Sequence, residues 1–570
     1  MRPFRLVCAL ALVIMSSTLA LAQGTGNSSL AGVVVDSVGG AVPGATVTVK
    51  SNATAATFEA VTNTAGAFSI PALDPGTYTV TIALSGFRTV VINDVRLLAA
   101  TPGSVRAVLE VGNVSETVEV RGGTELVQTQ SSTVSSTITT EQITNLPLVS
   151  RNALNFLVFL PGVETSGGPR GSTISGLPQN TISVTYDGVN VNNNFQSGDG
   201  FFSMVTPRLD AIEEVTVTGA TPTADQAALG AVQVAFVTRS GTNNFDGSIY
   251  HYFRHPNLNS NYYFNKIRGL ERNDVVVHQY GGRIGGPITI PGLFDGRNRA
   301  FFFFNMEEFY QPTEASRTRT ILHPRAQDGW FRYLATVGGA TEVREVNLYE
   351  LAQRNGHLST PDPITRQVLA NIRASTATTG TVSDLTNPTI QQFFYQSAGT
   401  NKQHAPTGRV DINLSQNHRL SGSYSWGRLV TNPDILNNND SPFPGFPVYG
   451  ISPSYRTVGS TSLRSTLSGS LVNEIRGGWQ WSPLDFSSNV YRDMFGQQGG
   501  FGWNFGNGGN IMFGMTTPSN LTGIEDRNTV NWNIDNTLNW LRGNHSMTFG
   551  GTFMQVNHAR TVWSLSLIHI

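Results

Sequence analysis

The residues of this chain that could do chemistry are few and poorly placed for it. His251 and His255 lie four residues apart, like the zinc ligands of a helical HExxH motif, but the flanking residues alternate as in a strand and no acidic residue completes the motif. Glu307 and Glu308 are adjacent, so in a strand they point to opposite faces and form no acid–base pair. We therefore expect no catalytic residue, no metal site, no cofactor and no enzyme activity.

Two groups of side chains could bind a ligand instead. The first is rich in the oxygen donors that a hard cation prefers, and we interpret it as a solvated loop: Asp434, Asn437, Asn438, Asn439 and Asp440. The second is a set of aromatic residues in a predicted loop, where ligand contact is possible: Tyr262, Tyr263 and Phe264. Aromatic residues at predicted strand positions fit an interfacial girdle better, and they include Trp479, Trp481, Trp532 and Trp540.

Composition and the N-terminus limit the class of protein. The chain has 570 residues, of which 13% are charged and 59 are glycine, and its net charge of -1 gives no reason to expect nucleic acid as a partner. Basic residues, an apolar stretch over 6–15 and a small-residue site predict a signal peptide over 1–22, cleaved between Ala22 and Gln23. Cys8 lies inside that stretch, so the mature chain is expected to contain no cysteine.

From Phe245 onward, apolar and polar residues alternate in runs of about ten, the length that a tilted strand needs to cross a bilayer. Val410 and Tyr424 would face lipid, whereas Arg409 and Asp411 would face water. Nine strands are predicted, at 245–254, 275–284, 300–310, 405–414, 419–427, 456–467, 471–481, 528–540 and 546–556. The connections between them alternate long and short, as in outer-membrane β-barrels with long outer loops and short periplasmic turns.

The segment 23–112 predicts a small β-sandwich, because β-branched runs alternate with Gly, Pro and Asp turns. Its residues include SLAGVVVDSVGGAVPGATVTV and TNTAGAFSIPALDPGTYTVTIALSGF, and they resemble the carboxypeptidase regulatory-like domain, a transthyretin-like fold related to carbohydrate-binding sandwiches. That module is not itself catalytic. Tyr78 and Phe87 are interpreted as core or turn-packing residues rather than as sugar contacts.

The segment 126–239 is predicted to be mixed α/β, with a short helix over 151–159 and a strand over 181–189. Its motifs LPLVSRNALNFLVFLPGV, YDGVNVN and IEEVTVTGATPTADQAALGAVQVAFVTRSG resemble the plug domain of TonB-dependent receptors. Together with GGRIGGPITIPGLFDGRNRAFFFFNMEEF, they resemble the Oar-like branch in order and spacing. The resemblance assigns 240–564 to the N-terminal part of an Oar-like barrel.

A linker over 113–125 contains a β-prone pentapeptide that resembles the TonB box. Its residues are Glu116, Thr117, Val118, Glu119 and Val120. In that family the box pairs as an added strand with a TonB-type periplasmic energy transducer, through main-chain contacts that do not require particular side chains. The alternative interpretation is that the pentapeptide is the last strand of the sandwich or part of a linker.

The resemblance implies a mainly β protein of the Gram-negative outer membrane: a periplasmic transthyretin-like sandwich, a mixed α/β plug, and the first nine or so strands of an antiparallel barrel of roughly 22 strands. It implies a receptor or transporter that contacts outer-membrane lipid, binds an unknown ligand and imports it with energy from the inner membrane. The alternative is an Oar-like surface protein that acts in adhesion or export. The sequence is expected to be a C-terminally truncated fragment, and 565–570 matches a sequencing adapter.

Overall fold

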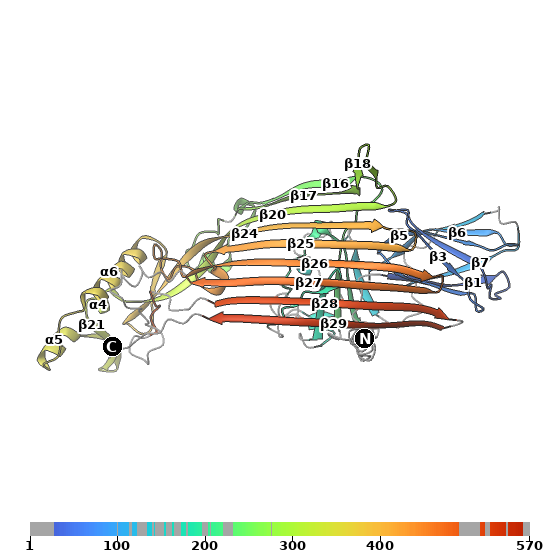
Figure 1. The fold of residues 1–570 in the computed structure, drawn as a ribbon. Helices are drawn as coiled ribbons and strands as arrows, with labels where there is room; N and C mark the ends of the chain where they lie inside the picture. The colour runs from blue at the N-terminus through green and yellow to red at the C-terminus, as the bar shows by residue number, and fades with distance from the viewer. Residues whose placement is uncertain are drawn as a thin grey trace, which may run out of the picture.

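The computed structural model describes residues 28–99, 101–112, 117–121, 134–139, 142, 153–155, 162–164, 173–177, 181–195, 203–205, 207–220, 232–274, 276–488, 514–518, 525–542 and 545–562. The expected signal peptide and cleavage site, Glu116 and residues 565–570 lie outside these ranges. Figure 1 shows one wide sheet of long strands, with a small β-sandwich at one end and the helices at the other. A second, smaller sheet lies behind the wide one (Figure 1).

The N-terminal domain is a two-sheet β-sandwich, as the sequence predicts. One sheet has the order β4-β1-β7 and the other β3-β2-β5-β6-β8. The strands are β1 (Ser28–Asp36), β2 (Thr46–Ser51), β3 (Thr57–Val61), β4 (Ala67–Leu73), β5 (Gly76–Ala83), β6 (Thr89–Leu97), β7 (Gly103–Leu109) and β8 (Thr117–Arg121). Alternate residues of β5 and β6 are buried, and Val80 and Ile82 are fully enclosed. Tyr78 and Phe87 belong to or pack against this core, as expected.

The second domain is a mixed five-stranded sheet with the order β13-β12-β15-β14-β9. Its strands are β9 (Val134–Thr139), β12 (Ile182–Tyr186), β13 (Val189–Asn190), β14 (Ile212–Ala220) and β15 (Val232–Thr238); a separate hairpin pairs β10 (Val163–Glu164) with β11 (Thr173–Ile174), and η4 is Leu209–Ala211. β12 pairs with β15 in parallel and is buried along its whole length, although its sequence ISVTY alternates apolar and polar residues. Of the predicted helix 151–159, only residues 153–155 are described, as one 3-10 turn.

The wide sheet contains nine consecutive antiparallel strands in chain order, with one short strand paired at its side. They are β16 (Asp246–Arg254), β17 (Val277–Pro287), β20 (Ala300–Leu322), β24 (Ile390–Asn413), β25 (His418–Asn432), β26 (Gly450–Ser468), β27 (Leu471–Ser488), β28 (Glu525–Arg542) and β29 (His545–Val562), with β23 (Thr381–Asp384) at the side of β24. Each lies where the alternation places it. Several are longer than predicted, because polar segments without alternation, such as 390–404, continue the ladder beyond the apolar band.

The two faces of this sheet are inverted relative to a soluble protein. Val410 and Tyr424 are 41% and 50% exposed, whereas Arg409 and Asp411 are 9% and 1% exposed. Exposed apolar residues continue across neighbouring strands and include Phe304, Ile475, Trp479, Trp481, Ile534, Phe549 and Phe553. An apolar outer face with a polar inner face is the pattern of a membrane β-barrel wall.

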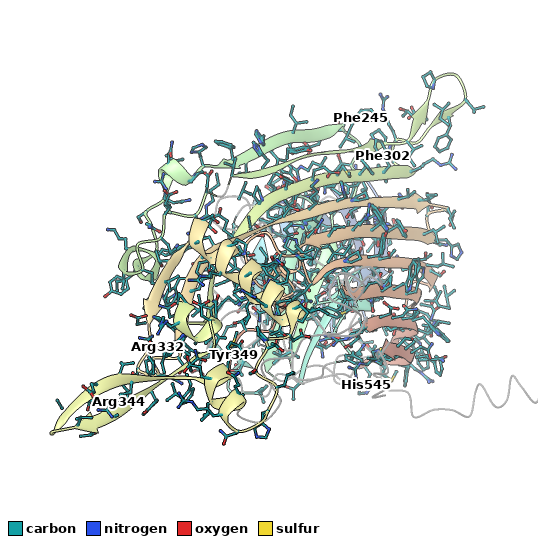
Figure 2. The ribbon with its side chains drawn as sticks, turned by 90° about the vertical axis from the view of Figure 1, so that its left-hand side faces the viewer. Phe245, Phe302, Arg332, Arg344, Tyr349 and His545 are labelled. Carbon is teal, nitrogen blue, oxygen red and sulfur yellow. The ribbon has the colours of Figure 1, made fainter. Side chains whose placement is uncertain are left out.

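Connections of different length lie at opposite ends of the wall. Those at the sandwich end are short, spanning 414–417 and 469–470, and a small hairpin there is formed by β18 (Thr289–Ile290) and β19 (Phe294–Asp295). The far end carries η5 (Pro256–Leu258), α3 (Tyr263–Ile267), α4 (Pro324–Gln327), β21 (Trp330–Val337), β22 (Ala340–Asn347), α5 (Leu348–Arg354), α6 (Pro363–Thr378) and η6 (Ile435–Asn437). Figure 2 shows the β21–β22 hairpin reaching away from the wall, with Arg344 along it and Arg332 near its base. None of the helices in the described parts of the chain is long and apolar enough to span a bilayer.

Candidate functional site between plug and wall

The YDGV motif forms the tight turn between β12 and β13 that fixes the second domain against the inner face of the wall. Asp187 has a φ of 47° and Gly188 a φ of 81°, so the turn uses two left-handed residues. The Asp187 carboxylate accepts hydrogen bonds from the backbone N–H of Thr238 at 2.9 Å and from the Ser423 hydroxyl at 2.6 Å. Ser460 donates to the Asp187 carbonyl at 2.9 Å. One turn therefore contacts its own sheet and two wall strands.

The same turn also fits closely against the next two wall strands. Asn531 of β28 donates from Nδ2 to the Asn190 carbonyl at 2.7 Å. On β27, a Cβ added at Gly478 would lie 2.1 Å from Cγ2 of Val189, so the wall has no room for a side chain there. The domain thus contacts the wall in two ways: the Val189 side chain packs directly against the wall backbone at Gly478, and polar groups form hydrogen bonds. Both are expected for a plug inside a barrel.

On β20, another strand of the same wall, the domain is fixed by a buried charge. Arg208 lies 3.3 Å from the carboxylate of Glu307, and both side chains are almost fully enclosed. Glu307 also accepts from the Tyr250 hydroxyl at 2.6 Å and from Gln279 Nε2 at 2.8 Å, so its charge is well compensated. Glu308 points to the other face and pairs with His404, which confirms that the two adjacent glutamates do not act together.

A charge network on β24 and β25 connects the wall to the N-terminal sandwich. Arg409 makes a bidentate contact to Asp411 at 2.9 and 3.0 Å, and its Nη1 donates to the Thr238 carbonyl at 2.9 Å. Arg419 contacts Asp411 at 3.3 Å and Asp74 of the sandwich at 2.5 Å. Two guanidinium groups share two carboxylates, which satisfies the charges that the inner face buries.

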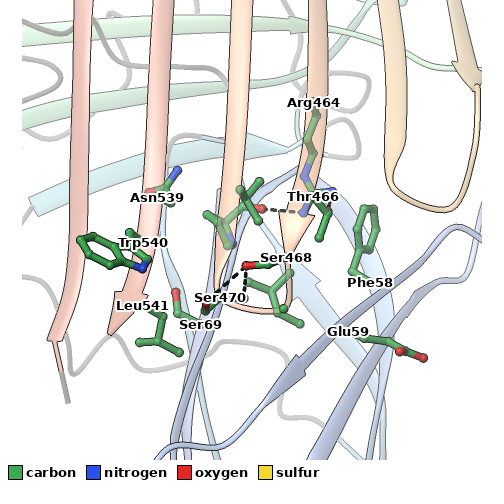
Figure 3. Close-up of a pocket in the computed structure, with 14 residues that line it drawn as sticks. Phe58, Glu59, Ser69, Arg464, Thr466, Ser468, Ser470, Asn539, Trp540 and Leu541 are labelled. Atoms are coloured by element: carbon green, nitrogen blue, oxygen red, sulfur yellow. Dashed lines mark hydrogen bonds between the residues drawn. The ribbon is translucent and has the colours of Figure 1, made fainter. Parts of the chain in front are cut away.

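A second sandwich contact surrounds Arg464 at the end of β26 (Figure 3). Its guanidinium donates to the Pro71 carbonyl at 3.1 Å and lies 4.6 Å from the centre of the Phe58 ring. Figure 3 shows the pocket beside it, lined by Phe58 and Ser69 from the sandwich and by wall residues from the β26–β27 turn and from the end of β28. An adjoining cavity of about 650 Å³ extends along the same seam. The sandwich is therefore docked on the short-turn end of the wall.

Glu214 forms a contact between sandwich and plug. It is 3% exposed and accepts a hydrogen bond from the backbone N–H of Ala99. Burial raises the pKa of Glu214 to about 8, with a further contribution from the neighbouring Glu213 carboxylate, while Arg96 opposes the shift. At neutral pH this carboxyl therefore retains its proton, which matches its enclosed position.

The residues of the predicted partner-binding pentapeptide lie on the sandwich. Thr117, Val118, Glu119 and Val120 belong to β8, which pairs with β6, and Glu116 is outside the described residues. In this structure the segment is the last strand of the sandwich, which was the alternative interpretation of the pentapeptide.

The predicted ligand-loop aromatics lie at the far end of the wall. Tyr262 precedes α3, which begins with Tyr263 and Phe264, and their side chains are 63%, 69% and 66% exposed. Tyr263 and Phe264 pack edge to face, with ring centres 5.3 Å apart. These three residues therefore remain available to a ligand, and their role is still a prediction.

In the oxygen-rich loop over 434–440, the predicted solvent exposure of the two aspartates is wrong. We expected solvated side chains, and Asn437 and Asn438 are exposed, but Asp434 and Asp440 are 1% and 0% exposed. Asp440 accepts from Arg317 Nε at 2.8 Å, and Asp434 accepts from the Asn437 side chain at 2.7 Å. The extended part of β20 brings Arg317 over this loop, and the strand lengths predicted from alternation did not include that part.

The two histidines four apart do not meet. His251 instead lies across the ladder from β17, with its Nε2 3.1 Å from Nδ1 of His278. In the described part of the chain, no group of three or more His, Cys, Asp or Glu side chains could hold a metal ion. The alternation identified Arg409 and Asp411 as water-facing, but the sequence did not indicate Asp74, Asp187 or Arg476 as contacts. Arg476 of β27 donates from Nη1 to the Asp187 carbonyl at 3.5 Å.

Three family models match this chain in the order of its domains. Residues 29–110 match the carboxypeptidase regulatory-like domain, 127–232 the TonB-dependent receptor plug domain, and 237–564 the outer membrane beta barrel domain. The last match covers more than half of the chain, and the chain belongs to this family of outer-membrane β-barrel proteins. It has the plug and part of the barrel of a TonB-dependent outer-membrane receptor, preceded by a regulatory-like sandwich.

Solved structures of similar fold were also found. The ferric enterobactin receptor PfeA of Pseudomonas aeruginosa, in complex with enterobactin, is 11% identical over 74% of this chain and 49% of its own, with a TM-score of 0.41. The outer membrane transporter YddB of Escherichia coli is 11% identical over 74% of this chain and 48% of its own, with a TM-score of 0.46. This chain therefore spans about half the length of these structures. Among curated proteins, none matches.

Proposed function

We propose that the complete protein is a transporter of the Gram-negative outer membrane that binds a ligand at its outer face and imports it through the plugged barrel. The observation that carries the proposal is the seating of the plug: the turn over 187–190 contacts four adjacent wall strands from the lumen side. A wide barrel closed by a separately folded domain is a gate rather than an open pore.

The proposal also orients the protein. Short turns of bacterial barrels face the periplasm and long loops face outward. The sandwich docks at the short-turn end through Asp74 and Pro71, so we place it in the periplasm, and the exposed aromatics over 262–264 face the outside. The exposed apolar band between these ends contacts outer-membrane lipid.

Energy must reach such a gate mechanically, because the outer membrane has no nucleotide pool or proton gradient of its own. We assign this role to a TonB-type periplasmic transducer that pairs with the pentapeptide of β8 by strand addition. Since strand addition uses the backbone, Val118→Pro should abolish the coupling, whereas Glu119→Ala should have a small effect. The ligand class is left to experiment.

The test is a growth comparison on panels of iron sources, vitamins, glycans and peptides. A deletion strain should show a defect on one class of nutrient, and the full-length gene with Glu119→Ala should restore growth. The gene with Val118→Pro should not, and loss of the transducer should give the same defect. Normal growth on every nutrient, combined with altered cell-surface behaviour, would overturn the proposal in favour of an adhesion or export protein.

A further inference from the structure

The pentapeptide that the proposed function assigns to the transducer is already paired within the protein. β8 runs parallel to β6, with Val90 opposite Val118 and Val91 opposite Glu119. It forms the outermost strand of the sheet β3-β2-β5-β6-β8. The family match to the sandwich ends at residue 110, so β8 is an addition to the matched domain.

The faces of the two strands agree with their register. Val90 is buried in the sandwich core, and Val118 packs against the same core from β8. Val91 is half-buried and Glu119 is exposed, so this second pair faces away from the core. Apolar pairing on one side and a polar residue on the other is what a genuine edge strand requires.

The sandwich that holds β8 is itself fastened to the rest of the protein. Arg419 and Arg464 hold it on the wall through Asp74 and the Pro71 carbonyl, and Glu214 of the plug holds it through Ala99. While β8 stays on β6, tension applied to β8 is carried by these contacts together. Only when β8 has left β6 does tension pass through the chain over 122–133 to β9, the first described strand of the plug.

We propose that the sandwich is a latch that competes with the periplasmic transducer for β8. The inference rests on the proposed function, because it assumes that the pentapeptide is the segment the transducer binds. In a two-state latch, the apparent dissociation constant equals the intrinsic constant divided by the fraction of molecules in which β8 is free. Any change that strengthens the β6–β8 pair therefore weakens transducer binding, without altering the pentapeptide.

Residue 91 allows the latch to be tuned from the sandwich side. Val91→Glu places a like charge opposite Glu119 and should favour release, whereas Val91→Lys places an opposite charge there and should favour the closed latch. Opposed charges on antiparallel strands change pairing by about two- to fivefold in equilibrium constant, and we expect a shift of this order for the parallel β6–β8 pair. Binding of the purified periplasmic domain of the transducer to the full-length protein in detergent should thus be tighter for Val91→Glu and weaker for Val91→Lys.

A disulfide between β6 and β8 would hold the latch closed covalently, so that transducer binding can be measured with β8 unable to leave. The double variant Val91→Cys with Glu119→Cys should lose at least tenfold in affinity for the transducer domain when oxidised and regain it on reduction. The matched control, Thr48→Cys with Thr81→Cys, joins opposed residues of β2 and β5 in the same sheet and should bind like the wild type in both states.

The outcomes separate the latch from the proposed function. If Val118→Pro binds the transducer domain as tightly as the wild type, the pentapeptide is not the binding segment and the proposed function loses its energy route. Val118→Pro could instead abolish binding while the disulfide variant and the Val91 substitutions leave the affinity for the transducer domain unchanged. The transducer would then bind the free edge of β8, and the latch would be wrong. The latch is supported if the oxidised double-cysteine variant loses affinity for the transducer domain, and if Val91→Glu binds it more tightly and Val91→Lys more weakly than the wild type.

Discussion

Arg419 of the wall and Asp74 of the sandwich form an ion pair, with Nη1 2.5 Å from Oδ2 and both groups largely enclosed. Asp74 lies in the turn between β4 and β5, and its backbone carbonyl accepts from the Tyr78 hydroxyl at 2.7 Å. Burial raises the pKa of Tyr78 well above its ordinary value, with a further contribution from the Asp74 carboxylate, so this hydroxyl stays protonated as a donor. The turn that presents Asp74 is therefore held from within the sandwich.

Asp74→Asn should loosen the sandwich from the wall by about 1–3 kcal/mol, because the only carboxylate left to Arg419 would be that of Asp411, at the longer distance. The readout is the rate at which a maleimide labels a cysteine placed at Ser69, which lines the seam. Labelling should accelerate several-fold with Asp74→Asn. Asp94→Asn removes an exposed sandwich carboxylate and should leave the rate unchanged; equal rates for all three proteins would show that the ion pair does not hold the interface.

Gly478→Ala should unseat the plug, because the new Cβ would lie 2.1 Å from Val189 and 2.9 Å from the Gly459 carbonyl. We expect a cost of about 1–3 kcal/mol, as for other overpacked sites. The measurement is the protease resistance of the plug in outer-membrane vesicles, which should fall in Gly478→Ala. The neighbouring Gly477→Ala places its Cβ 3.9 Å from the nearest backbone oxygen and serves as the control. Similar resistance of the two variants would contradict the close fit of this turn.

Substitution of Asp187 should loosen the same turn in two separable steps. Asn tolerates the left-handed conformation, with φ of 47°, and loses the charge, whereas Ala loses the acceptors and adds backbone strain. Hydrogen exchange of the amides over 182–190 should therefore be faster in Asp187→Asn than in the wild type, and faster again in Asp187→Ala. An unchanged exchange rate in Asp187→Ala would mean that Thr238 and Ser423 do not hold the turn.

Glu214 should make the folded protein more stable in acid than in base. Its pKa rises from 4.5 to about 8 on folding, so between these values the folded state keeps a proton that the unfolded state has lost. Stability from this group is complete below pH 4.5 and is lost as the pH rises to 8, by about 3–5 kcal/mol at most. The melting temperature of the wild type should fall over this range, whereas that of Glu214→Gln should fall less. Parallel curves would refute the buried, protonated carboxyl.

The sequence predicts the wall well because its signal is local. Val410, Asp411 and their neighbours alternate with the period of a strand, and the inner and outer faces follow directly from that period. The ends of β20 and β24 were missed because their polar residues pair beyond the apolar band, where no alternation is needed.

Contacts between distant segments were not predictable in the same way. Nothing near Asp74 indicates Arg419, and nothing near Thr117 indicates a parallel partner in β6, since both depend on how whole domains dock. The burial of Asp440 was missed for the same reason, because its partner Arg317 lies on the extended part of β20. One sequence signal did indicate these contacts: charged residues such as Arg409 and Asp411 occupy strand positions that the alternation predicts to face the inside of the barrel.

The most direct test of the central claim is the initial rate of uptake, by energised cells, of the nutrient that the growth comparison identifies. We expect Val118→Pro to reduce this rate at least tenfold, to the level of a strain without the transducer, and we expect no further effect when the two defects are combined. Uptake at the wild-type rate by Val118→Pro would contradict an import gate driven through β8.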